Sequence, residues 1–87
     1  MRNVEFDIEE GALIASLSGE IDHYAAADMR REIDSAMERS RLKDLVLDYS
    51  GVSFMDSSGI GLVMGRYQNV KRKNGTMVVV PGSRYVS

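Results

Sequence analysis

The chain has 87 residues, with no cysteine, one proline and one histidine, and 11 Lys and Arg against 13 Asp and Glu give a net charge of -2. This length accommodates a single domain with a small core, and the lack of cysteine excludes disulfides, thiol chemistry and cysteine-ligated zinc. The charge balance argues against the uniformly basic surface of a direct nucleic-acid binder, and one histidine leaves little for a metal site, so we expect neither metal nor cofactor.

The expected cellular compartment is inferred from the N-terminal sequence and from the lengths of the apolar runs. The first eleven residues, MRNVEFDIEEG, are acidic and contain no apolar run, so they do not form a signal peptide. No stretch approaches the ~20 apolar residues that span a bilayer. We therefore expect a cytoplasmic protein that does not bind membranes.

Two strands in a hairpin are predicted first. Apolar residues alternate with acidic ones over residues 4–9, the period-two pattern of a half-buried strand. Glu10-Gly11 is typical of a turn, and residues 12–18 repeat the alternation. The apolar positions are Val4, Phe6 and Ile8 in the first run and Leu13, Ala15 and Leu17 in the second.

A helix over residues 23–39 comes next. Asp22 is the expected N-cap, because its carboxylate can accept a hydrogen bond from an unpaired N–H of the first turn. Apolar residues recur at helical spacing on one stripe, which we expect to face the core. That stripe comprises Ala25, Met29, Ile33, Ala36 and Met37.

The next predicted strand covers residues 42–49, LKDLVLDY. Its consecutive apolar residues are typical of a strand that is covered on both faces or central in a parallel sheet. Ser50-Gly51 is then expected to turn, and residues 52–55 to form a short connection to Asp56.

The second half of the chain predicts a helix over residues 57–73 and a last strand over 76–80. Asn74-Gly75 suits the left-handed residue that closes a helix, and Pro81-Gly82 stops the strand. The expected inner stripe of this helix comprises Ile60, Val63, Met64, Tyr67 and Val70.

The predicted order is therefore β-β-α-β-α-β within a single domain over residues 1–87. Successive βαβ units are right-handed, which places both helices on the same face of one sheet. We expect an α/β fold of two layers, with a mixed sheet of about four strands and two helices.

Chemistry is concentrated in residues 53–61, SFMDSSGIG, where a strand leads into a helix N-terminus. Open α/β sheets place their ligands at such ends, and the helix dipole there would accommodate a phosphate on Ser57 or Ser58. Asp-Ser-Ser is also simply a good capping sequence, and periodicity alone favours that plainer interpretation.

Interior helical glycines such as Gly61 and Gly65 cost about 1 kcal/mol each, so close packing on the sheet or close approach of a partner's backbone must justify them.

Catalysis is not expected. The frame G-x-S-x-G of a nucleophile elbow is absent, as are the glycine patterns of phosphate-binding loops. His23 is the only histidine available as a base, and a histidine at a helix start is usually solvated or beside the cap. The chain has one basic pair, Arg30-Arg31, and one basic triplet, residues 71–73. Solvated helix faces explain both better than a nucleic-acid patch does.

Four segments together resemble a known family. They are residues 19–23 (GEIDH), 45–48 (LVLD), 54–61 (FMDSSGIG) and 65–67 (GRY). They resemble bacterial anti-sigma factor antagonists, which are single-domain STAS proteins, and the last segment is most similar to the sporulation branch.

The resemblance implies a protein without catalytic activity that is itself the substrate of its partner. Unmodified, it would bind an anti-sigma factor that is also a serine protein kinase, and so free a sigma factor. Phosphorylation of the first serine after the aspartate, here Ser57, would end that binding, and a protein phosphatase would restore it. The partner contacts that the resemblance implies are Asp22, His23, Asp56, Ser58, Gly59 and Gly61.

Two other functions stay open beside this one. One is a STAS subunit of another assembly, such as a lipid-transport or stress-sensing complex, and the other is a nucleotide-binding STAS module. Members of the resembled family also carry a further helix after the strand matched by residues 76–80, and Ser83 stands where its cap would be. We therefore expect a C-terminally truncated module that self-associates or exchanges elements through the uncovered region.

Overall fold

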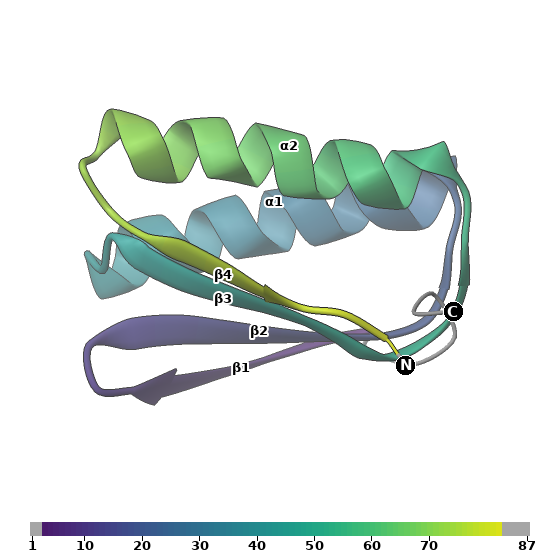
Figure 1. The fold of residues 1–87 in the computed structure, drawn as a ribbon, viewed down its shortest axis with the longest axis horizontal. Coiled ribbons are helices and arrows are strands. Elements are labelled where there is room, and N and C mark those ends of the chain that lie inside the picture. The colour runs from purple at the N-terminus through teal and green to yellow at the C-terminus, as the bar shows by residue number, and fades with distance from the viewer. Residues whose placement is uncertain (1–2, 83–87) are drawn as a thin grey trace.

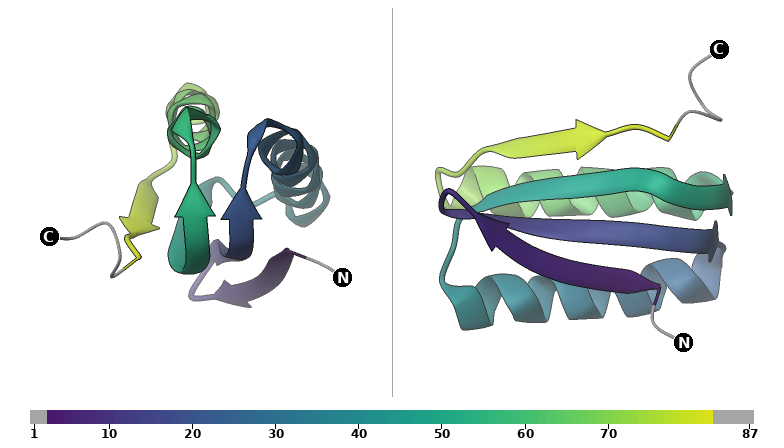
Figure 2. Two further views of the ribbon diagram at one scale, coloured as in Figure 1. Left: turned by 90° about the vertical axis from the view of Figure 1, so that its right-hand side faces the viewer. Right: turned by 90° about the horizontal axis from the view of Figure 1, so that it is seen from below.

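The computed structural model describes residues 3–82, so the expectation for Ser83 lies outside the described residues. The elements in chain order are β1 (Val4–Glu9), β2 (Ala12–Ile21), α1 (His23–Ser40), β3 (Asp44–Met55), α2 (Ser57–Arg72) and β4 (Met77–Val80). The sheet has the order β1-β2-β3-β4, in which only β1 and β2 are antiparallel. Both helices lie side by side on one face of this sheet, which confirms the predicted fold class (Figures 1 and 2).

The hairpin between β1 and β2 forms where it was predicted. Glu10 and Gly11 both have positive φ, 51° and 80°, as a two-residue hairpin turn requires. Val4 is buried and Phe6 is half-buried, but Ile8 is 56% exposed. The first strand is therefore covered only over its first half.

The strand ends differ most from the prediction. Strand β2 continues to Ile21 and β3 continues to Met55, so the predicted turn at Ser50-Gly51 and the connection over 52–55 are wrong. The two strands stay paired through this region, with register shifts between Ser16 and Ser18 and between Gly19 and Glu20. Gly19 and Gly51 therefore lie at irregularities within paired strands and not in loops. Glycine is common at such irregularities.

The core lies between the sheet and the two helices. Strand β3 confirms one of the two predicted alternatives, because it is central with parallel neighbours β2 and β4. Only one of its faces is fully covered, since Leu45, Leu47 and Tyr49 are buried while Val46 on the other face is half-buried. In α1 the predicted stripe is confirmed except at its start, where Ala26 rather than Ala25 is buried. The largest fully buried side chains are Leu17, Ile21, Met29, Ile33, Leu45, Leu47, Val4 and Val70.

Helix α2 is rotated relative to the prediction. Its buried residues are Gly59, Leu62, Arg66 and Val70. Three members of the predicted inner stripe are instead exposed, with Ile60 at 57%, Met64 at 58% and Tyr67 at 47%. Size and hydrophobicity alone would have turned the helix the other way, so specific contacts of its buried face must set its rotation.

Candidate functional site

The two helix N-termini lie next to each other because the strands that precede them are paired. Ile21 at the end of β2 is in register with Met55 at the end of β3. The hydrogen bonding between the two segments continues one residue beyond Met55, where the Asp56 N–H donates to the Ile21 carbonyl at 3.1 Å. Figure 2 shows both strands rising into their helices at this end of the sheet. Asp22 and Asp56, both predicted as partner contacts, therefore lie near each other at the carboxyl ends of β2 and β3.

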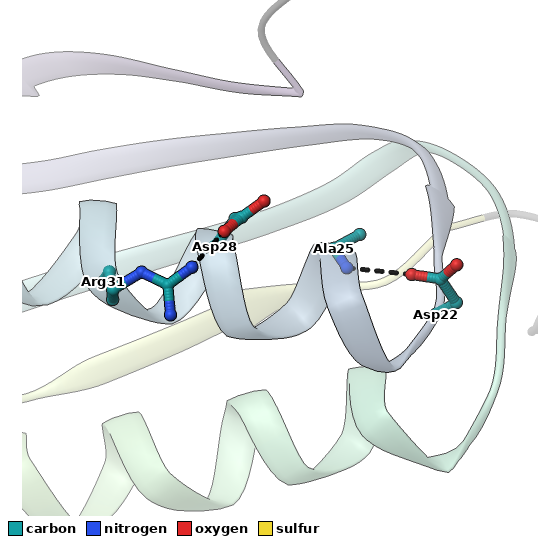
Figure 3. Close-up of polar contacts among 4 residues, drawn as sticks. All are labelled: Asp22, Ala25, Asp28 and Arg31. Atoms are coloured by element: carbon teal, nitrogen blue, oxygen red, sulfur yellow. Dashed lines mark hydrogen bonds and ion pairs between the residues drawn. The ribbon is translucent and has the colours of Figure 1, made fainter.

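Asp22 caps α1 as predicted. Its carbonyl accepts a hydrogen bond from the Ala26 N–H at 2.9 Å. Its Oδ1 accepts one from the Ala25 N–H at 2.8 Å (Figure 3). The same figure shows the Asp28–Arg31 ion pair one turn further along the exposed side of α1. The Asp22 carboxylate is thus held in place at the start of the helix, where the dipole stabilises negative charge.

Asp56 plays the same part for α2 and leaves the first serine unengaged. Its Oδ1 accepts from the Ser58 N–H at 2.8 Å, and its carbonyl accepts from the Gly59 N–H at 3.0 Å. Ser58 is half-buried, whereas Ser57 is exposed. Among residues 3–82 the Ser57 hydroxyl has no hydrogen-bond partner. A modifying enzyme could therefore reach it without breaking an internal bond.

Gly59 fixes how α2 sits on the sheet. A Cβ at this position would lie 2.5 Å from the Met55 Sδ and 3.1 Å from the Met55 Cβ. The Tyr49 hydroxyl donates to the Gly59 carbonyl at 2.8 Å. Burial raises the pKa of Tyr49 to about 12, against a smaller opposite effect of Arg66, so this donor keeps its proton. Gly59, predicted as a partner contact, is buried and anchors the site from below.

Gly61 and Gly65 have different surroundings. A Cβ at either position would meet nothing within 4 Å. Neither residue has a positive φ, so neither needs the conformational freedom of glycine. Packing against the sheet, one of the two explanations offered by the sequence, therefore applies to Gly59 and not to these two.

A groove runs between the N-terminal halves of the two helices, and we refer to it as the interhelix groove. Its volume is about 280 Å³. Small residues form much of its lining, namely Ala26, Ala27, Gly61 and Gly65. The rest of the lining consists of the apolar Leu62 and four polar or basic side chains, namely His23, Arg30, Ser58 and Arg66. The groove thus brings together three predicted contact residues, His23, Ser58 and Gly61. Its two arginines were not predicted as contacts, since Arg30 was expected on a solvated helix face and Arg66 had no assigned role.

Arg66 is the unusual member of this groove because only 6% of the residue is exposed. Its Nε lies 2.9 Å from the Asp34 Oδ1 of α1, yet the Nε–H makes no hydrogen bond of good geometry. Burial lowers the pKa of Arg66, Arg30 adds to that effect, and Asp34 opposes it. The guanidinium therefore ties the helices together while keeping unused hydrogen-bonding capacity.

Exposed apolar side chains surround the site. Phe54 is 59% exposed just before the Asp56 cap, and Ile60 and Met64 follow on the outer face of α2. Tyr24, 78% exposed, packs edge-on against His23 with ring centroids 5.6 Å apart. Contiguous exposed apolar surface is typical of protein contact sites. Sequence periodicity missed this surface because it placed Ile60 and Met64 in the core and gave no role to Phe54 or Tyr24.

Over residues 3–82 no group of three or more His, Asp and Glu side chains is arranged to hold a metal ion. In the same part of the chain, no helix is long and apolar enough to cross a membrane. The arrangement of exposed hydroxyl, fixed carboxylates, basic groove and apolar rim instead suits recognition of another protein.

Comparison with known proteins gives the same picture. The family model described as "STAS domain" matches residues 3–86. The anti-sigma F factor antagonist of Paenibacillus polymyxa is 40% identical over 76 residues, which are 87% of this chain and 65% of the relative. The anti-sigma F factor antagonist of Lysinibacillus sphaericus is 34% identical over 78% of this chain and 58% of its own. The chain therefore spans about three fifths of the length of these two relatives.

Two solved structures of SpoIIAA also match. The anti-sigma factor antagonist SpoIIAA in its unphosphorylated form has a TM-score of 0.75 and 29% identity, over 95% of this chain and 79% of its own. The phosphorylated form of the Bacillus protein has a TM-score of 0.75 and 28% identity, over 93% and 75%. These relatives are regulatory binding proteins rather than enzymes, in agreement with the prediction for this chain.

Proposed function

Because the chain belongs to the STAS domain family, we propose that it is an anti-sigma factor antagonist controlled by phosphorylation of Ser57. In the unmodified form it binds an anti-sigma factor that is also a serine kinase, and a sigma factor is released. The kinase then transfers the γ-phosphoryl group of ATP to the Ser57 Oγ, with release of ADP and of the hydroxyl proton, and this modification ends the binding. A phosphatase removes the phosphate and restores the binding form.

The observation that carries this proposal is the position of Ser57. It is exposed, its hydroxyl is not bonded within the described chain, and it follows the fixed carboxylate of Asp56 at the start of α2. The Asp22 loop lies beside it through the Asp56–Ile21 hydrogen bond. Phe54 and Ile60 supply apolar contact area on either side. A protein partner that covers this surface necessarily covers Ser57.

The switch requires no change of fold. A phosphate adds about -1.5 to -2 charge next to Asp56, and the N-terminal end of the helix dipole offsets part of the resulting repulsion in the free chain. Against a partner surface the same charge must be desolvated beside an existing carboxylate, which costs several kcal/mol. A penalty of ~3 kcal/mol weakens binding about a hundredfold.

The test begins with incubation of the full chain with the anti-sigma factor of the same genome and ATP. Mass spectrometry of the peptide over residues 56–59 is expected to place one phosphate on Ser57. Calorimetry is then expected to show that Ser57→Ala binds the anti-sigma factor, while Ser57→Asp binds about a hundredfold more weakly.

A matched control separates the position of the charge from its presence. Ser35→Asp adds the same charge at an exposed position three turns along α1, so its affinity should equal that of the unmodified chain. Equal binding by Ser57→Asp and Ser57→Ala would refute the switch. No phosphate on Ser57 would favour a STAS subunit of another assembly, and tight binding of ATP or GTP without phosphorylation would favour a nucleotide-binding module.

A further inference from the structure

The interhelix groove contains two glycines that the fold itself does not explain. Each glycine in a helix interior costs about 1 kcal/mol relative to alanine. At Gly59 the contact with Met55 justifies that cost, but at Gly61 and Gly65 a Cβ would meet nothing within 4 Å. These two glycines are four residues apart and so lie on one face of α2. They leave the helix backbone accessible along the groove, which is useful only to something that approaches it closely.

The charges of the groove indicate what approaches. Its basic side chains are His23, Arg30 and Arg66, and no acidic residue is among those that line it within the described chain. Asp34, the partner of Arg66, lines a neighbouring groove instead. Arg66 is only 6% exposed, and its Nε is buried 2.9 Å from the Asp34 Oδ1, but its two terminal amino groups have no hydrogen-bond acceptor within the described chain. An incoming carboxylate would supply the missing acceptor and relieve the repulsion between the two arginines.

We propose that the interhelix groove binds an acidic segment of the anti-sigma factor, with its backbone against Gly61 and Gly65 and a carboxylate on Arg30 and Arg66. This inference rests on the proposed function and names the chemistry of its partner. Two of the lining residues, His23 and Ser58, connect the groove to the surface around Ser57. The groove and that surface together form one continuous interface.

A protein segment fits the groove better than a free anion does. A phosphate ion would use the arginines but would gain nothing from two glycines one helical turn apart. It would also gain nothing from Ile60 and Met64, which are 57% and 58% exposed on the same helix. Arginine contacts beside exposed apolar side chains are, by contrast, common among the residues that contribute most to protein interfaces.

The test is a binding series with the purified full chain and the anti-sigma factor of the same genome. Gly65→Ala and Gly65→Leu progressively fill the groove, and the open space at this position should leave folding intact, which circular dichroism checks. We expect Gly65→Leu and Arg30→Gln each to weaken binding by about tenfold or more. The control Arg31→Gln removes the same charge from the adjacent residue, which does not line the groove, and should change affinity less than about twofold.

The chain lacks cysteine, so a second readout is available. Gly65→Cys provides a single thiol for a photoreactive maleimide, which should cross-link to an acidic segment of the anti-sigma factor. Ser16→Cys, on the sheet face away from the helices, should not cross-link.

The outcomes separate this inference from the proposed function. If Ser57→Asp weakens binding but Gly65→Leu and Arg30→Gln do not, the groove is not part of the interface and only the inference is wrong. If inorganic phosphate displaces the partner at constant ionic strength, the groove is a site for free anions and the inference is likewise wrong. If the unmodified chain does not bind the anti-sigma factor at all, both proposals are wrong.

Discussion

Alanine substitution of the three glycines of α2 tests how the helix is held on the sheet. Gly59, Gly61 and Gly65 stand in the same helix, but only Gly59 is pressed against another element. At that position a new Cβ would lie 2.5 Å from the Met55 Sδ, 3.1 Å from its Cβ and 3.2 Å from its Cγ. The Sδ atom can rotate away, but the Met55 Cβ is attached to the backbone of β3 and cannot.

The magnitudes follow from two opposing effects. Replacing a helical glycine by alanine stabilises by about 1 kcal/mol through helix propensity and reduced entropy of the unfolded chain. Gly61→Ala and Gly65→Ala should gain that amount, because the added methyl group enters open space. Gly59→Ala should in addition incur the about 1–3 kcal/mol typical of an overpacked site. The difference between Gly59→Ala and Gly61→Ala isolates the overlap with Met55 and should be about 1–3 kcal/mol.

Urea and thermal denaturation of the full chain, followed by far-UV circular dichroism, measure this difference. For a domain of this size each kcal/mol corresponds to about 4–8 °C in Tm, so Gly59→Ala should melt at least ~4 °C below Gly61→Ala. The double substitution Gly59→Ala with Met55→Ala removes the Met55 Sδ and Cγ but keeps its Cβ. It should therefore recover only part of the loss attributed to overlap, as a double-mutant cycle would reveal.

Two results would refute this reasoning. The first is a Gly59→Ala variant as stable as Gly61→Ala, because the close approach to Met55 would then not constrain α2. The second is a Gly61→Ala or Gly65→Ala variant that is clearly destabilised, because the space around those residues would then not be open. The second result would also remove the argument that these glycines serve a partner.

The other predictions concern Tyr49 and β4. The unfolded chain loses the Tyr49 proton near its ordinary pKa of 10.0, whereas the folded chain retains it until about pH 12. The contribution of this raised pKa to the free energy of unfolding is therefore fully present below pH 10, and it should fall by at most about 2 kcal/mol as the pH rises to 12. The variant Tyr49→Phe should not show this fall. An identical decline in the variant would assign the loss of stability to other groups. Tyr49→Phe should also lower stability at pH 7 by about 1–3 kcal/mol, because the buried Gly59 carbonyl loses its donor. Within the described chain β4 pairs only with β3, and Val78, Val79 and Val80 are 56%, 38% and 38% exposed. We propose that this edge self-associates, so sedimentation at rising concentration should detect dimers that Val78→Lys suppresses, and a strictly monomeric mass would contradict this.

Much of the fold could be predicted because local patterns and the final structure agree. Alternation defined the hairpin, and Asp22 and Asp56 marked both helix starts, because each carboxylate caps its helix by accepting from a backbone N–H of the first turn. The α1 stripe was nearly correct because its large apolar residues are the ones that contact the sheet. Fold class followed from element order, since βαβ handedness left a single arrangement.

The rotation of α2 could not be predicted from periodicity. Its largest apolar residues face outward, and its buried face carries two features that hydrophobic patterning assigns to the surface, a glycine and an arginine. The glycine is buried because Met55 approaches it, and the arginine because Asp34 lies on the neighbouring helix. Both reasons are tertiary contacts with residues distant in sequence. The residues predicted for the site lie close together, but the groove between the helices and the exposed apolar side chains around it became visible only in three dimensions.

The unbonded hydroxyl of Ser57 has a consequence for the lifetime of the protein in the cell. Esterification of a hydroxyl that supports no internal hydrogen bond leaves the core and both helix caps intact. Proteases act on the unfolded fraction, which depends on folding stability. Under the proposed switch, the modified and unmodified forms should therefore be degraded at similar rates, which differ only through the part of the Asp56 repulsion that the helix dipole does not offset. The cell would then keep one constant pool of molecules and change only the share that is active, so each dephosphorylation returns a working molecule without new synthesis.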